Sequence, residues 1–90
     1  MYYIYVLKSI KDQKLYTGVS SNLRTRIKAH NEGRVRATKN RRPLQLIYYE
    51  AYLHKKDATQ REHNLKHKTE QRKFLKRQIQ NSFLAPSSSG

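Results

Sequence analysis

Three short runs of aromatic and β-branched residues limit what this 90-residue chain can fold into. The runs are YYIYVL at 2–7, LYTGV at 15–19 and LQLIYYEAYL at 44–53. Their composition and length are typical of β-strands. The polar link KSIKDQK between the first two runs is short, which favours an antiparallel hairpin. We therefore expect a three-stranded, mainly antiparallel sheet at the centre of the fold.

A first helix is expected between the second and third strands, in the segment NLRTRIKAHN at 22–31. Ser20 or Ser21 can cap its beginning, and Gly33 is placed to end it. The basic segment RVRATKNRRP at 34–43 follows, with room for one short helical turn.

A second, longer helix is expected after the third strand. It opens at Asp57, and Gln60 three residues later gives it a capping-box-like start. Its helical residues continue to the end of the domain, with a break near 67–69. The order of elements predicts an α/β domain of the α+β kind, with helices packed on the sheet. We assign residues 1–84 to this single domain and residues 85–90, APSSSG, to a disordered C-terminal tail.

The chain is strongly basic, with 20 Lys and Arg against 6 Asp and Glu and a formal net charge of +14. Such an excess favours a polyanionic partner, with DNA as the expected partner and RNA as the alternative. No apolar stretch approaches the roughly 20 residues that span a bilayer, and the N-terminus lacks the order of a signal peptide. We therefore expect no membrane association, a cytoplasmic location and no obligate protein partner. The absence of cysteine excludes disulfides and cysteine-ligated metals.

The first helix has one face that we expect to dock on the sheet, defined by Leu23 and Ile27 at about 100° per residue. Arg26 and His30 lie one turn apart beside that contact, whereas Arg24 and Lys28 face solvent. One interpretation is that Arg26 extends along the interface and His30 is a hydrogen-bonded histidine at its boundary. The other interpretation is that both side chains belong to a functional site.

The second helix repeats this pattern. Ala58 and Leu65 mark its inward face, and Glu62 lies between them along the same face. The simplest interpretation of Glu62 is an i,i+4 pair with Lys66, worth about 0.2–0.5 kcal/mol. A carboxylate at a helix–sheet junction, near an arginine and a histidine, is also what a divalent cation site acting on phosphate requires.

Seven tyrosines lie in or near the predicted strands. A period of two places Tyr3, Tyr5 and Leu7 on one face of the first strand, and Tyr16 is expected across from that face. Filling the core of a small sheet is the commoner role of such residues, and we keep it for Tyr2, Tyr48, Tyr49 and Tyr52.

Four pieces of the sequence form a known pattern by their order and spacing. They are Tyr3-Ile4-Tyr5, Tyr16-Thr17-Gly18, Asn22-Leu23-Arg24-Thr25-Arg26 followed by His30-Asn31, and Ala58…Arg61-Glu62…Lys66. Over about residues 2–68 the chain resembles the GIY-YIG nuclease superfamily, and most of all its small stand-alone bacterial branch. In that branch, too, a basic RRP segment precedes the third strand.

The resemblance implies catalytic positions at Tyr5, Tyr16, Arg26, His30 and Glu62. It implies hydrolysis of phosphodiester bonds with one divalent metal, Mg²⁺ or Mn²⁺, ligated by Glu62. Arg26 would stabilise negative charge on the phosphate, and Tyr16 would orient water or phosphate. Tyr5 would act as general base or position the attacking water, and His30 would take or relay the proton. The identity of the base stays open between Tyr5 and Tyr16, with or without His30.

The remaining positive charge is expected to track the phosphate backbone at Arg24, Lys28, Arg34, Arg36, Lys39, Arg41 and Arg42. Lys55–Lys56 and Lys76–Arg77 are interpreted as solvated surface charge. We expect a DNA endonuclease of low sequence specificity that selects structures such as branches or single strands, in DNA repair, recombination or mobile-element biology. The alternatives are a catalytically weak or inactive nucleic-acid-binding module, and an RNA- or ribosome-associated protein whose tyrosines and arginines stack on bases.

Overall fold

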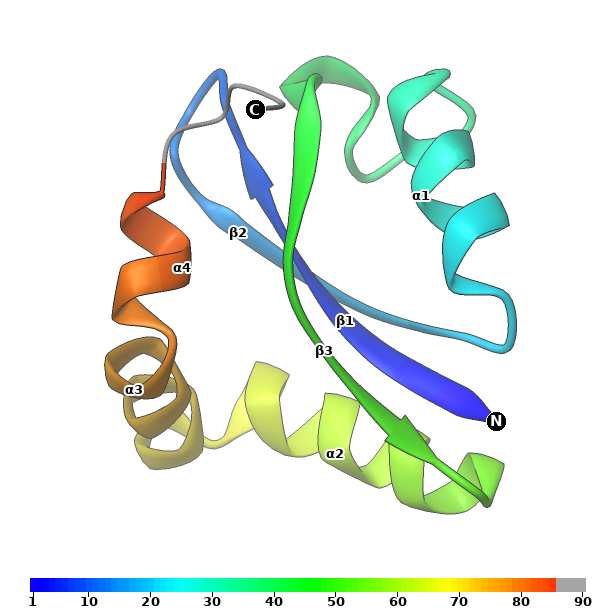
Figure 1. The fold of residues 1–90 in the computed structure, drawn as a ribbon, viewed down its shortest axis with the longest axis vertical. Helices are drawn as coiled ribbons and strands as arrows, with labels where there is room; N and C mark the ends of the chain where they lie inside the picture. Colours follow the sequence, from blue (N-terminus) through cyan, green and yellow to red (C-terminus); the bar gives the residue numbers. More distant parts are fainter. Residues whose placement is uncertain (86–90) are drawn as a thin grey trace.

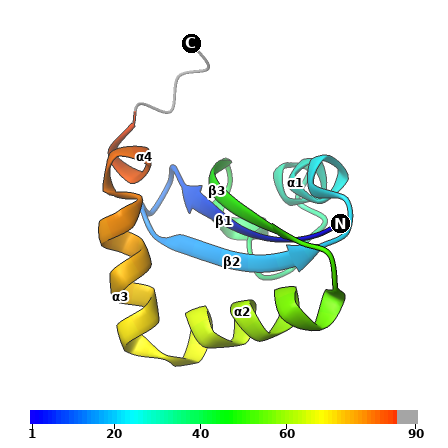
Figure 2. The same ribbon diagram turned by 60° about the horizontal axis from the view of Figure 1, so that its bottom comes forward.

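A computed structural model describes residues 1–85 as a three-stranded sheet with helices on both faces (Figures 1 and 2). The elements are β1 (Tyr2–Ser9), β2 (Leu15–Ser20), α1 (Leu23–Asn31), the 3₁₀ turn η1 (Lys39–Arg41), β3 (Leu44–Tyr52), α2 (Lys55–His67), α3 (Thr69–Gln78) and α4 (Gln80–Leu84). The predicted C-terminal tail lies, apart from Ala85, outside the described residues. Within residues 1–85, no helix combines the length and the apolar character needed to cross a membrane.

The sheet has the strand order β2-β1-β3, and both pairings are antiparallel. This confirms the predicted α+β fold with an antiparallel three-stranded sheet. The central strand β1 places Tyr5 between Gly18 of β2 and Tyr49 of β3. The pairing of β1 with β3 shifts register once, between Val6 and Leu7.

The two faces of the sheet support two separate clusters of buried side chains. On one face, Tyr5, Leu7 and Leu44 pack with Tyr16, Leu46 and the docking residues of α1, Leu23 and Ile27. On the other face, Ile4 and Val6 pack with Ala58 and Leu65 of α2 and with Leu75 and Ile79. The alternation predicted for the first strand and the docking faces predicted for both helices are confirmed. Figure 2 shows α1 and α2 on opposite sides of the sheet.

The predicted core role of four tyrosines holds for three of them. Tyr2, Tyr48 and Tyr52 pack against the cluster on the α2 side. Tyr49 is 52% exposed, so its assignment to the core was wrong. Its strand lies at an edge of the sheet, and its ring makes an edge-to-face contact with the ring of Tyr3.

The cap of α1 differs from the prediction. Asn22, not Ser20 or Ser21, has the extended backbone of a cap, and its side chain accepts a hydrogen bond from the backbone N–H of Thr25. The predicted end of the helix is confirmed, because Gly33 has a φ of +77°. The N–H groups of Gly33 and Arg34 bond back to His30 and Ala29, the pattern of a Schellman motif.

The start of α2 also differs from the prediction. The helix begins at Lys55, two residues before Asp57, and His54 precedes it without a side-chain cap. The lysines at the start are good helix formers, and Asp57 then lies in the first turn, where a negative charge is favoured by the helix dipole. The predicted break is confirmed, because Lys68 has an extended backbone between α2 and α3.

Candidate active site

Four of the five residues predicted to be catalytic meet on the α1 face of the sheet. Tyr5 lies at their centre, and its side chain is only 1% exposed. Its hydroxyl is 2.9 Å from His30 Nε2 and accepts a hydrogen bond from Arg26 Nε at 3.4 Å. The ring of Tyr16 lies 6.5 Å from that of Tyr5 and 5.1 Å from that of His30, centre to centre. The strands supply the two phenols, and one face of α1 supplies the guanidinium and the imidazole.

Gly18 makes room for the Tyr5 side chain. It lies directly opposite Tyr5 in the β1–β2 pairing, and a Cβ added there would overlap the hydroxyl and the ring of Tyr5. The glycine in the YTG triplet therefore allows the phenol to lie flat across the neighbouring strand. Any side chain at this position would have to displace the hydroxyl from His30.

His30 is completely buried and uses both of its ring nitrogens. Nδ1 is 2.7 Å from the hydroxyl of Thr38, which is also completely buried. Burial, together with the positive charge of Arg26, lowers the pKa of His30 to about 4. The imidazole is therefore neutral at neutral pH, with one nitrogen that donates and one that accepts.

Thr38 was missed by the sequence analysis. It lies in the irregular connection between α1 and η1, where no helical or strand periodicity indicates which side chains point inward. The only available signal was compositional, because Thr38 is one of two uncharged polar residues in the basic segment 34–43.

The hydroxyl of Tyr5 holds its proton at neutral pH. Burial raises its pKa above 10.0, the neighbouring charges of Tyr16 and Glu62 add to this, and the hydrogen bond from Arg26 opposes it. Arg26 itself is exposed overall, so its guanidinium extends from the buried phenol toward solvent. It thus offers further N–H donors to an incoming anion.

Glu62, the fifth predicted residue, lies on α2 beyond β2. Its side chain is 24% exposed and pairs with Lys66 at 3.2 Å, as the simplest interpretation of the sequence predicted. Among the described residues its ion pair is with Lys66 and not with Arg26 or His30. Lys66 Nζ in turn lies 5.7 Å from the centre of the Tyr16 ring, so Lys66 and Tyr16 connect Glu62 to the other three residues.

A metal ion would find one carboxylate at this site. No group of three or more His, Asp and Glu side chains suited to a metal occurs within residues 1–85. A hard cation such as Mg²⁺ commonly binds one or two protein carboxylates and completes its shell with waters and substrate phosphates. The oxygen chemistry of Glu62 fits that mode of binding.

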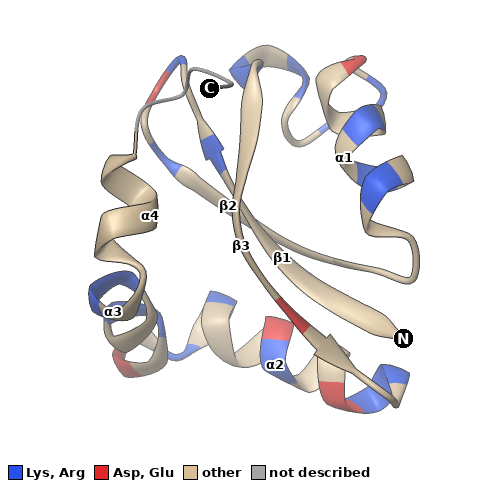
Figure 3. Cartoon of the chain, viewed as in Figure 1, with Lys and Arg blue, Asp and Glu red and all other residues tan. Residues whose placement is uncertain are grey.

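The basic residues predicted to contact phosphates differ in their surroundings. Arg41 is held by Asp12 at 2.8 Å and also donates to the carbonyl of Leu15. Arg34 pairs with Glu32, and Arg42 donates to the carbonyl of Lys39. The remaining side chains lie exposed on α1 and on the connection to β3: Arg24, Lys28, Arg36 and Lys39. Figure 3 shows Lys and Arg positions along both segments.

Glu50 forms a polar cluster on the other face that the sequence analysis did not predict. Its carboxylate accepts hydrogen bonds from the hydroxyls of Tyr48 and Tyr52 and from Nε and Nη2 of Arg61, each nitrogen at 3.0 Å. Although burial opposes it, these hydrogen bonds lower the pKa of Glu50 below 4.5. Because Arg61 directly precedes Glu62, this cluster ties the part of α2 that carries Glu62 to β3.

The chain is similar to a known domain family, to several bacterial proteins and to a solved structure. The GIY-YIG catalytic domain matches residues 1–76. A UPF0213 protein of Clostridium perfringens is 45% identical over 75 residues, which cover 82% of this chain and 80% of that protein. A UPF0213 protein of Pediococcus pentosaceus is 42% identical over 79 residues, which cover 84% of this chain and 82% of that protein. The solution NMR structure of a UPF0213 protein from Bacillus halodurans, 26% identical, superposes with a TM-score of 0.56 and covers 99% of this chain and 100% of that one.

Proposed function

This chain belongs to the GIY-YIG catalytic-domain family, and we propose that it is an endonuclease that hydrolyses phosphodiester bonds in DNA with one divalent cation. The observation that carries the proposal is the buried hydroxyl of Tyr5, which contacts both His30 and Arg26. A phenol, a neutral imidazole and a guanidinium around one point suit proton transfer beside a phosphate.

The proposed proton path runs from the attacking water through Tyr5 to His30. With Arg26 donating to its oxygen, the phenol proton is directed at His30 Nε2, while Nδ1–H donates to Thr38. As water attacks the phosphorus, Tyr5 accepts a proton from it and passes its own to His30. A bound phosphate offsets the charge of Arg26, which is one of the two causes that lower the pKa of His30. Substrate binding therefore makes His30 a better proton acceptor.

Arg26 binds the phosphate in this proposal. Its Nε is engaged with Tyr5, and its exposed end retains N–H donors for the phosphate oxygens. A planar, permanently charged guanidinium stabilises the extra negative charge of the transition state without itself titrating. A phosphate bound by Arg26 in this way would have its phosphorus beside the Tyr5 oxygen.

Glu62 is the proposed ligand of the cation, Mg²⁺ or Mn²⁺. The cation, when bound, neutralises charge on the phosphate and on the leaving oxygen. Holding a cation would weaken the ion pair of Glu62 with Lys66, and Lys66 would then be available to a second phosphate. Neutralising Glu62 also removes one of the charges that raise the pKa of Tyr5, so the phenol loses its proton more readily.

Low sequence specificity follows from the kind of contacts that the exposed basic residues offer. Arg24, Lys28, Arg36 and Lys39 extend from a helix and a loop beside the site. Side chains of this type contact phosphates, which position a substrate but carry no direct sequence information. The expected substrate is therefore DNA recognised by its backbone and shape.

The experiment is cleavage of supercoiled plasmid, single-stranded DNA and branched DNA in Mg²⁺, Mn²⁺ or chelator. We expect cleavage in a divalent cation, none in chelator, and loss of activity in Glu62→Ala and Arg26→Ala. Glu32→Ala is the matched control, because this carboxylate is exposed and pairs with Arg34 at the end of α1. Cleavage by Glu62→Ala at the wild-type rate would overturn the proposal.

One observation favours a second candidate, a nucleic-acid-binding module without turnover. The carboxylate of Glu62 is already paired with Lys66, and Glu62 is the one acidic residue among the five predicted to be catalytic. DNA binding without cleavage in either metal would support this module. Tight RNA binding that Arg26→Ala leaves unchanged would instead support an RNA-associated protein.

A further inference from the structure

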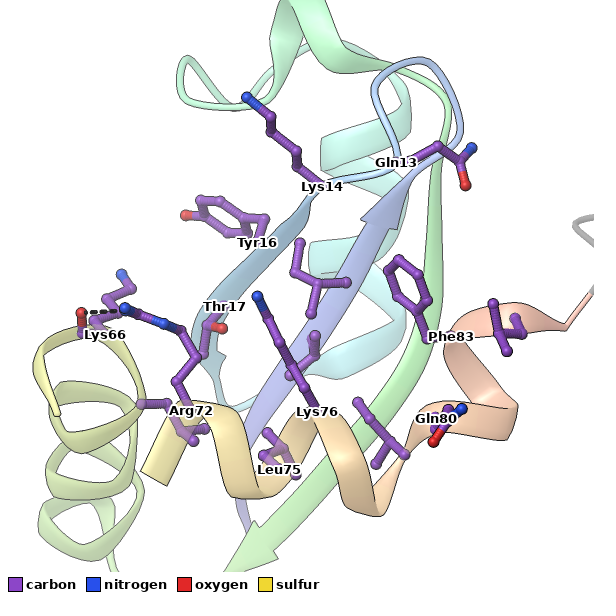
Figure 4. Close-up of a pocket in the computed structure, with 15 residues that line it drawn as sticks. Gln13, Lys14, Tyr16, Thr17, Lys66, Arg72, Leu75, Lys76, Gln80 and Phe83 are labelled. Atoms are coloured by element: carbon purple, nitrogen blue, oxygen red, sulfur yellow. Dashed lines mark hydrogen bonds between the residues drawn. The ribbon is translucent and has the colours of Figure 1, made fainter. Parts of the chain in front are cut away.

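A groove of about 810 Å³ lies next to the candidate active site, between β2 and the helices α3 and α4 (Figure 4). We call it the α3 groove. Its volume is within the range of about 300–1,000 Å³ that small-molecule sites occupy. Its floor is apolar and consists chiefly of Val6, Leu65, Leu75, Ile79 and Phe83. These residues come from β1, α2, α3, α4 and the junction between α3 and α4, so the groove is formed by the tertiary fold.

The charged residues on the rim of the α3 groove are all cationic: Lys14, Lys66, Arg72 and Lys76. No acidic residue within residues 1–85 lines it. Lys76 extends along the groove in Figure 4, and Arg72 donates one hydrogen bond to the carbonyl of Lys66, which leaves its other N–H groups available. Lys76, interpreted from the sequence as solvated surface charge, lies on this rim, whereas Arg77 is not part of the lining.

The groove begins at the candidate active site. Tyr16 lines the groove, and its ring is also 5.1 Å from that of His30. Lys66, on the same rim, carries the ion pair with Glu62. A ligand that runs from the catalytic residues past Tyr16 therefore enters the α3 groove directly.

We propose that the α3 groove binds an unpaired nucleotide of the substrate, next to the phosphate that is cleaved. This inference rests on the proposed nuclease function and assigns it a substrate with a single-stranded segment. An apolar floor suits the face of a base, and a cationic rim suits the phosphates on either side of it. A base within a duplex cannot present its face, because that face is stacked on its neighbours.

The charge of the groove argues for this occupant over a second copy of the chain. Two such rims, with four cations each, would repel one another across a dimer interface. An uncharged apolar ligand would leave the rim cations unpaired. A nucleotide would place its base against the apolar floor and its phosphates beside the cations of the rim.

The test measures binding in chelator by fluorescence anisotropy, so that it does not depend on cleavage. The ligands are a labelled oligothymidylate and an abasic oligomer of equal length, which carries the same phosphates without bases. We expect wild type to bind the oligothymidylate about tenfold more tightly, since each stacked base contributes substantially to affinity. Equal affinities for the two oligomers would overturn the proposal.

Two variants locate the effect in the groove. Lys76→Glu should weaken oligothymidylate binding at least fivefold more than Arg77→Glu, the matched charge reversal on the next residue of α3. Phe83→Ala should reduce the preference for thymidylate over the abasic oligomer, and thermal denaturation verifies that it folds. Equal effects of Lys76→Glu and Arg77→Glu would overturn the proposal, since they would indicate attraction by overall charge.

Failure of this inference is distinguishable from failure of the nuclease proposal. The groove is tested by binding without a divalent cation, and the nuclease by cleavage with one. A protein that cleaves DNA but binds both oligomers equally retains the proposed function and lacks the groove site. A dimer that Phe83→Ala dissociates would make the groove an interface between copies and would also overturn the inference.

Discussion

The hydroxyl of Tyr5 is the buried polar atom around which the candidate site is built. His30 and Arg26 contact it directly, and Thr38 holds the far side of the imidazole. Leaving the buried polar group of Tyr5, His30 or Thr38 without a partner would cost about 1–3 kcal/mol, so the hydrogen-bond chain orients these side chains. Gly18 completes the arrangement by leaving space where the phenol crosses β2.

His30 should make the stability of the protein depend on pH between about 4 and 6.5. Its pKa is about 4 when folded against 6.5 in the unfolded chain, so the unfolded state binds more protons in this window. Its contribution is therefore present above pH 6.5 and is lost as the pH falls toward 4. From this source the free energy of unfolding should fall by about 2 kcal/mol between about pH 7 and about pH 5.

Urea denaturation of wild type and His30→Gln at the two pH values measures this effect. The variant should show a much smaller difference between them, while His63→Gln, which alters an exposed histidine, should behave like wild type. An equal pH dependence in wild type and His30→Gln would show that His30 is not the group responsible.

Gly18→Ala should destabilise the protein by about 1–3 kcal/mol, because the added methyl overlaps the Tyr5 side chain. It should also abolish cleavage, since the phenol must move away from His30. In a Tyr5→Leu background the same substitution should lose most of its cost, because the overlapping hydroxyl is gone. Chemical denaturation of the four proteins of this double-mutant cycle measures the coupling, and additive effects would contradict the explanation.

At the scale of elements, the strands and helices could be predicted because their apolar residues repeat with clear periods. The first-strand alternation and the docking face of α1 placed Tyr5, Arg26 and His30 near one another correctly. The caps could not be predicted in the same way. Ser20, Ser21 and Asn22 are all capping residue types, and which one caps depends on where the backbone turns.

The Glu50 cluster could not be predicted either, because its partners come from β3 and α2. Glu50 lies in an apolar run with no charged neighbour to indicate a pair, and Arg61 lies on a helix with many cations. Only the tertiary packing of α2 on the sheet brings them together. Thr38 escaped prediction for a related reason, since it lies in a connection without periodicity.

Glu50→Gln should lower the free energy of unfolding by about 2 kcal/mol, because hydrogen bonds to charged groups contribute about 1.5–3 kcal/mol. It leaves the partly buried guanidinium of Arg61 without its counter-charge. Denaturation with urea measures the loss, and Glu70→Gln, an exposed carboxylate on α3, is the control and should change stability by no more than about 0.5 kcal/mol. Equal stability of Glu50→Gln and wild type would contradict a structural role for this cluster.

At the scale of the whole molecule, the positive charge is distributed over several elements and the acidic residues are scattered (Figure 3). The composition alone predicted an anionic partner, but it could not separate cations that face a substrate from those with structural partners. Arg41 illustrates the difference, because Asp12 holds its guanidinium. Lys76 illustrates the reverse, because the fold places it on the rim of the α3 groove.

Binding to duplex DNA should weaken steeply with salt, with the logarithm of the association constant falling by about 0.9 per neutralised phosphate for each unit of log salt concentration. Lys28→Ala should reduce this slope by about 0.9, because its exposed side chain lies on α1 beside the site. Lys55→Ala, at the start of α2, removes the same charge and should leave the slope unchanged. Titrations at several salt concentrations in chelator measure both slopes, and equal slopes for the two variants would contradict the assignment.

The central claim is that the buried Tyr5–His30 pair transfers the proton during phosphodiester cleavage, and single-turnover cleavage by Tyr5→Phe tests it most directly. Because the transfer needs an unprotonated His30 and a Tyr5 that holds its proton, the wild-type rate should increase with pH up to about pH 6 and then stay level to about pH 9. Tyr5→Phe should be slower by about 10²–10⁴-fold and should lose this dependence, while Tyr49→Phe, an exposed tyrosine on β3, should match wild type. A Tyr5→Phe protein that cleaves DNA at the wild-type rate with the wild-type pH profile would contradict the account.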